Sequence, residues 1–117
     1  MNETADIKGG KLFFVENKKC FSIGSREINQ SEIKKISNIP ELDKVIFYCI
    51  KFISVDFSVF SSARVNQLTF LHGNCSKINL EQICKIPSIK VIQLLDTNVS
   101  NEEITSIKVD YPNILFK

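Results

Sequence analysis

The sequence predicts an α/β fold, in which a short right-handed solenoid has a parallel sheet of four to five strands on its concave side and short helices on its convex side. Three observations predict this fold. A six-residue apolar pattern typical of strands recurs at intervals of 23 and 24 residues. A pattern typical of a short helix precedes two of these strands. Each helix pattern ends at a proline, which stops a helix and favours an extended chain.

The strand pattern has apolar residues at its first, fourth and sixth positions. The three clear copies are Leu42, Val45 and Phe47, then Val65, Leu68 and Phe70, then Ile89, Ile92 and Leu94. Phe21 and Ile23 belong to a weaker first copy, which would begin at the polar residue Lys18. We expect the apolar residues at the fourth and sixth positions to point inward from neighbouring strands and to form one continuous core.

Two stretches match each other as short helices with one buried stripe, because their apolar residues stand three apart. They are Ile33, Ile36 and Ile39 before Pro40, and Leu80, Ile83 and Ile86 before Pro87. Both stretches have the same position relative to the strand that follows. The segment 55–63 is less regular: Val55, Val59 and Phe60 fit a helix, whereas its serines disfavour one.

The N-terminal part of the chain predicts a cap on the first repeat. Residues 11–15 and 20–23 flank a polar turn, which is typical of a β-hairpin. Such a cap is needed because an end repeat would otherwise expose its core. We expect residues 1–10 to be a flexible N-terminus and residues 11–117 to form a single domain.

These repeats resemble the leucine-rich repeat, L-x-x-L-x-L-x-x-N/C-x-L, over residues 18–117. Thr97-Asn98-Val99-Ser100 resembles the T-x-V-[ST] variant that is common in bacterial repeat proteins, and residues 111–116 resemble a truncated last strand. The chain departs from the pattern at the asparagine position, which Ile50 and Gly73 occupy in two of the repeats. The resemblance implies a fold and the binding of another macromolecule, but it does not identify the partner.

The third, fifth and seventh positions of the strand pattern predict the side chains that face outward from the concave sheet. They are Lys44, Ile46, Tyr48, Gln67, Thr69, Leu71, Val91, Gln93 and Leu95. The first copy adds Ser22, and the last strand adds Leu115 or its neighbour. Tyr48, Leu71 and Leu95 share one position on three neighbouring strands, where a solvated face would be mostly polar. Such an apolar row predicts a protein-binding surface. Two alternatives stay open: apolar residues favour strands in general, or the N-terminal segment covers this face.

A row of chemically reactive residues follows the strands. Cys49, His72 and Asp96 occupy the eighth position of successive copies. Parallel strands lie about 4.8 Å apart, so a thiol hydrolase using these three residues is a remote alternative. A glycine-rich turn that could supply an oxyanion hole is not evident beside Cys49. A sheet of so few strands is also shallow for a substrate. We therefore predict that the chain is not an enzyme, with a His72–Asp96 ion pair at the margin of the binding face.

Composition argues against several other classes. The chain has 117 residues and a formal charge of +2, which does not favour nucleic acid or an anionic membrane surface as a partner. No apolar stretch is long enough for a membrane span. One histidine and four scattered cysteines lack the spacing of metal ligands, and we expect no cofactor. Without a secretion signal or a CxxC pair, the cysteines predict reduced thiols in a cytoplasmic protein.

The sequence therefore predicts a non-catalytic protein-binding module. The partner is expected to contact Lys44, Ile46, Tyr48, Thr69, Leu71, Val91, Gln93 and Leu95, with His72 and Asp96 at the margin. A solitary module of this size favours one dedicated partner, so we expect an immunity or antitoxin-type protein that neutralises a toxin by occlusion. The alternative is an adaptor or scaffold subunit of a larger assembly.

Overall fold

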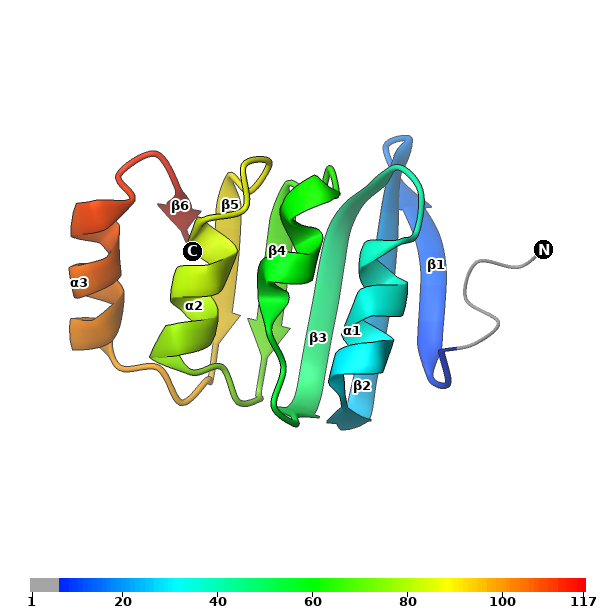
Figure 1. Cartoon of the computed structure of the whole chain (residues 1–117), viewed down its shortest axis with the longest axis horizontal. Helices are drawn as coiled ribbons and strands as arrows, with labels where there is room; N and C mark the ends of the chain where they lie inside the picture. Colours follow the sequence, from blue (N-terminus) through cyan, green and yellow to red (C-terminus); the bar gives the residue numbers. More distant parts are fainter. Residues whose placement is uncertain (1–6) are drawn as a thin grey trace.

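In the computed structural model, which describes residues 7–117, the chain forms an α/β fold around one six-stranded sheet (Figure 1). In sheet order, the strands are β1 (Gly10–Val15), β2 (Lys18–Ile28), β3 (Leu42–Phe52), β4 (Gln67–Leu71), β5 (Val91–Leu95) and β6 (Leu115–Phe116). The helices are α1 (Gln30–Ser37), the 3-10 helix η1 (Phe57–Ser62), α2 (Lys77–Cys84) and α3 (Asn101–Asp110). They lie on one face of the sheet, and we call the opposite side the open face (Figure 1).

The sheet is mixed, so the prediction of a parallel sheet of four to five strands is wrong in one respect. Strands β2 to β6 are parallel to one another, but β1 pairs with β2 in the antiparallel direction. The predicted hairpin is present, and its outer strand is the first strand of the same sheet. Its turn consists of Glu16 and Asn17, with φ of 50° and 69°. This left-handed pair matches the twist of a tight two-residue hairpin.

The predicted strand register is confirmed for β3, β4 and β5. Val45, Leu68 and Ile92 lie side by side, as do Phe47, Phe70 and Leu94 in the next inward position. All of these residues are buried except Leu94, which is partly buried and packs against the same core. The apolar pattern therefore fixes which face of each strand points toward the helices.

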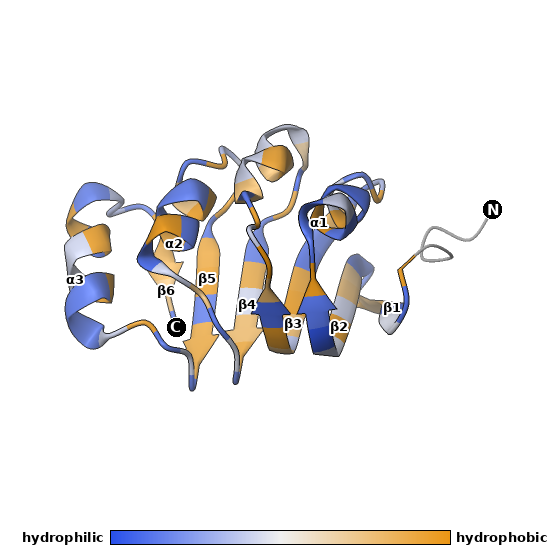
Figure 2. Ribbon diagram, turned by 60° about the horizontal axis from the view of Figure 1, so that its bottom comes forward, coloured by the Kyte–Doolittle hydropathy of each residue, from blue (hydrophilic) through white to orange (hydrophobic). Residues whose placement is uncertain are grey.

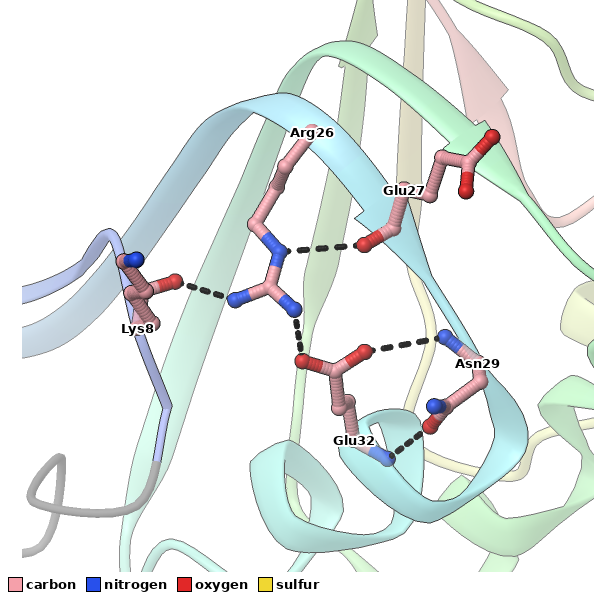
Figure 3. A network of polar contacts seen from close by, with 5 residues as sticks. All are labelled: Lys8, Arg26, Glu27, Asn29 and Glu32. Carbon is pink, nitrogen blue, oxygen red and sulfur yellow. Dashed lines mark hydrogen bonds and ion pairs between the residues drawn. The ribbon is translucent and has the colours of Figure 1, made fainter.

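The two predicted helices are also confirmed as α1 and α2, and their six stripe residues are buried. Helix α1 begins with a reciprocal capping box, visible in Figure 3. The backbone N–H of Glu32 donates to Oδ1 of Asn29 over 3.0 Å, and the backbone N–H of Asn29 donates to Oε1 of Glu32 over 3.1 Å. These bonds satisfy donors that the first turn of a helix cannot pair internally.

The same network fixes the segment before β1. Arg26 donates through its guanidinium to the carbonyl oxygens of Lys8 and Glu27 and forms an ion pair with Glu32 (Figure 3). Ile7 is 3% exposed and belongs to the core. Of the segment 1–10 that was predicted to be flexible, residues 1–6 lie outside the described residues. Residues 7–10 contact the domain, because the apolar side chain of Ile7 is buried in the core.

An aromatic layer fills the space between the sheet and the helices. The irregular segment 55–63 forms η1, whose residues Phe57 and Phe60 are fully buried. The ring centroid of Phe57 lies 5.3 Å from that of Phe52 and 5.9 Å from that of Phe70. Helix η1 contacts both α1 and α2, so the rings of these residues join the helical layer to the sheet.

The four cysteines are free thiols, as predicted, and three of them are buried. Burial raises the pKa of Cys75 to about 12 and that of Cys84 to about 11, because an apolar environment disfavours the thiolate. Burial also raises the pKa of Cys20, while Cys49 is exposed.

We expect an alkylating reagent at mildly alkaline pH to modify only Cys49 in the native protein, because alkylation requires an accessible thiolate. Intact-mass measurement should show one adduct before denaturation and four adducts after it, matching the four cysteines of the chain. A disulfide-linked peptide, or rapid native labelling of Cys75, would contradict this assignment.

Candidate functional site

The open face displays one apolar row. Tyr48, Leu71 and Leu95 lie side by side on β3, β4 and β5, as the sequence predicted, and Gly24 continues the row on β2. Tyr48 is 44% exposed and Leu95 is 52% exposed, while Leu71 between them is half-buried. Figure 2 shows that apolar residues predominate along β4 and β5. We call Tyr48, Leu71 and Leu95 the apolar row.

Gly24 makes room for the aromatic member of the row. A Cβ atom at position 24 would lie 2.2 Å from the Tyr48 ring, so any larger residue there would displace the ring. The Tyr48 ring therefore lies flat over the backbone of β2, with part of its surface in solvent. A side chain held in this way has little conformational freedom left to lose when it binds a partner.

The centre of the open face is polar and tightly packed. Thr69, which the sequence placed among the partner contacts, is 3% exposed. The side-chain amide of Gln67 donates to the Thr69 hydroxyl over 3.0 Å, and this hydroxyl donates to Oε1 of Gln93 over 3.3 Å. Neighbouring side chains cover the short Thr69. The two hydrogen bonds of its hydroxyl leave this buried group satisfied and orient the side chains of Gln67 and Gln93.

The other predicted residues of the strands surround this centre. Lys44, Ile46, Val91 and Gln93 are half-buried, and the strand register places all of them on the open face. At the hairpin end of this face is a hollow of about 220 Å³. Its lining includes Phe13, Cys20, Lys44 and Gln67.

Apolar side chains of the hairpin and of the last strand also lie on this face. Phe13 lies opposite Cys20 in the hairpin, and Val15 is 52% exposed on the same strand. Leu115 on β6 lies beside Val91 and is 54% exposed. The hairpin was predicted only as a cap on the first repeat, so the side chains of its outer strand were not assigned to the site. The run of apolar residues at 12–15 does not by itself show which residues face outward.

Cys49, His72 and Asp96 follow the apolar row: His72 and Asp96 come directly after β4 and β5, and Cys49 lies at the equivalent place within β3. Nδ1 of His72 lies 3.1 Å from Oδ2 of Asp96, which confirms the predicted pair. Both side chains are more than half exposed, where ion pairs contribute little to stability. Cys49 occupies the neighbouring strand and is exposed. The pair therefore lies in solvent at the margin of the face.

These residues also share a backbone conformation. Cys49, His72 and Asp96 have φ of 51°, 53° and 53°, and Ser25 at the equivalent place on β2 has a φ of 56°. The left-handed region is uncommon for residues other than glycine, although Asp and His are enriched there. The pairing of β2 with β3 continues beyond this position at Arg26 and Ile50 in the same register, whereas β4 and β5 end directly before it.

Among residues 7–117, no group of three or more His, Cys, Asp or Glu side chains could hold a metal ion. Over the same residues, every helix is too short or too polar to cross a membrane. No family model, curated protein or solved structure matches the chain.

Proposed function

We propose that this chain is a non-catalytic protein-binding module that docks a partner on its open face. The observation that supports this proposal best is the apolar row, whose end members, Tyr48 and Leu95, are 44% and 52% exposed. Exposed apolar side chains that adjoin one another are characteristic of interaction surfaces. The face around the row combines half-buried apolar residues with satisfied polar ones, as in the core and rim of an interface.

Each part of the face has a role in this proposal. Tyr48 and Leu95 provide apolar contact area, and an aromatic residue near the centre of a patch often dominates binding energy. Gln67 and Gln93 are oriented by Thr69, so their remaining polar groups can bind backbone or side-chain groups of the partner. The exposed His72–Asp96 pair lies at the margin, where charges mainly set orientation and association rate.

We further propose that the architecture is a short leucine-rich-repeat-like solenoid. Successive units of strand and helix are spaced by 23 and 24 residues, and their strands stack in equivalent register. Oδ1 of Asn98 accepts a hydrogen bond of 2.7 Å from the backbone N–H of Cys75, which links the loops of two successive units. Repeat proteins of this kind bind partners over an extended sheet surface.

The partner that we propose is a toxin, which the chain would neutralise as an immunity or antitoxin-type protein by covering its functional surface. Occlusion requires a stable face and no chemistry. The open face fits this requirement because the pairing of β3, β4 and β5 fixes the spacing of its side chains. Co-expression with the product of the neighbouring gene tests this part: the chain should restore growth that the product alone inhibits.

The docking face can be tested by affinity capture with two matched variants. Leu95→Lys places a charge in the apolar row, and docking would have to bury that charge. Ile78→Lys makes the same change at a 70% exposed position on α2, away from the open face. We expect a stoichiometric partner to be retained by the wild type and by Ile78→Lys, but to be reduced at least about tenfold with Leu95→Lys. Equal retention by Leu95→Lys would contradict the proposal.

A further inference from the structure

Strand β1 forms a long outer edge of the described sheet. It pairs with β2 on one side over six consecutive residues without a bulge. An edge strand presents backbone N–H and C=O groups that can pair with another strand. The opposite edge, β6, has only two residues, which is one common way to protect an edge. Of the two edges, β1 is therefore the one suited to pairing.

The side chains of β1 do not protect this edge. Natural edge strands usually carry charges, prolines or bulges that prevent association. In β1 the only charge is Lys11 near the start, and residues 12–15 are all apolar. Phe14 is 65% exposed and Val15 is 52% exposed. Because strand side chains alternate, these two residues expose apolar surface on both sides of the sheet at the same edge.

We propose that β1 pairs with β1 of a second copy of this chain, in the antiparallel direction, so that the two copies share one continuous sheet. The order of residues in the strand supports a second copy as the occupant. Lys11 stands at one end, the apolar run 12–15 in the middle and Glu16 directly after it. An antiparallel copy aligns the two apolar runs and places Lys11 of each chain opposite Val15 of the other, one residue from Glu16. Lys18 lies on β2, one strand further from this edge.

The geometry of the pairing follows from symmetry. A twofold axis that makes two identical edge strands antiparallel must stand perpendicular to the sheet, and closed twofold dimers are the commonest protein oligomers. Leu12 packs against the core, and with the axis near Phe13 it would lie opposite Phe14 of the other copy. The aromatic ring that is exposed in one chain would then extend the core of the other. Both open faces would lie on the same side of the dimer.

Sedimentation-velocity or light-scattering measurements of the full chain, over a concentration series into the millimolar range, test this inference. We expect a concentration-dependent species of twice the 13.3 kDa mass of the chain. Phe14→Lys should shift the dimer to monomer, because Phe14 is exposed and its replacement leaves the fold intact. Ile78→Lys and Leu95→Lys make the same change at exposed positions away from β1, and both should leave the dimer unchanged.

Three results would overturn the inference. The chain could stay monomeric throughout the series, in which case the edge is either idle or reserved for a different protein. Phe14→Lys could leave the dimer intact, which would place the contact elsewhere. Leu95→Lys could abolish the dimer, which would place the second copy on the open face. Only this last result would also affect the proposed protein-binding face, so failure of the two proposals can be distinguished.

Discussion

Replacing Phe57 by alanine is expected to lower the free energy of unfolding by about 3–5 kcal/mol. Phe57 is fully buried in η1, and its ring contacts the rings of Phe47, Phe52, Phe60 and Phe70. Removing the ring leaves a cavity and deletes several aromatic pairs, each worth about 0.5–1.5 kcal/mol beyond its buried area. A domain of this size has a total stability of about 5–15 kcal/mol, so the loss is a large fraction of it.

The effect is measured by urea unfolding followed by circular dichroism. The urea concentration at the midpoint of unfolding should be lower for Phe57→Ala than for the wild type. The dependence of the unfolding free energy on urea concentration should stay near that of the wild type. The control is Ile78→Ala at a 70% exposed position, which should change stability by no more than about 0.5 kcal/mol. A loss below about 1 kcal/mol for Phe57→Ala would mean that the aromatic layer does not join the helices to the sheet.

The part of the fold with the clearest periodicity was predictable. Strands β3, β4 and β5 follow a pattern that recurs after 23 and 24 residues, and helices α1 and α2 share a pattern at the same position before their strands. Each pattern fixes a buried face. Val45, Leu68 and Ile92 are all buried for this reason. Register along a strand is strongly determined when one face is buried, because a shift by one residue would expose the whole apolar set.

Elements without a repeating pattern were not predictable to the same degree. Phe57 follows Asp56, whose side chain caps η1 by accepting from the backbone N–H of Ser58 over 2.9 Å. The serines of this segment disfavour an α-helix, and the result is a 3-10 helix that still buries two aromatic rings. Ile7 was assigned to a flexible segment because polar residues and glycines surround it, although its apolar side chain reaches the core.

The candidate site was predictable as a set of outward positions, but not in its detail. Alternation along the strands correctly places Tyr48, Leu71 and Leu95 side by side. It could not show that Thr69 is covered, because burial on a sheet face depends on the sizes of its neighbours. The fit of the Tyr48 ring over Gly24 was equally hidden, since it depends on a contact between two strands that are far apart in sequence.

Replacing Tyr48 by alanine is expected to weaken partner binding by about 2 kcal/mol or more, which corresponds to roughly thirty-fold in Kd. The ring is 44% exposed and rests on Gly24, so it offers the partner a large apolar surface in a fixed position. Its loss should leave the core intact, because Tyr48 points away from the helices. The urea midpoint of the variant is therefore expected to stay close to that of the wild type.

Docking of a protein partner on the open face is the central claim, and calorimetric titration of the captured partner tests it most directly. The comparison is between the wild-type chain, Tyr48→Ala and Lys34→Ala, because Lys34 is exposed on α1 on the opposite side of the sheet. We expect a Kd at least about thirty-fold higher for Tyr48→Ala and an unchanged Kd for Lys34→Ala. An unchanged Kd for a folded Tyr48→Ala variant, or an equal loss in both variants, would contradict binding through the open face.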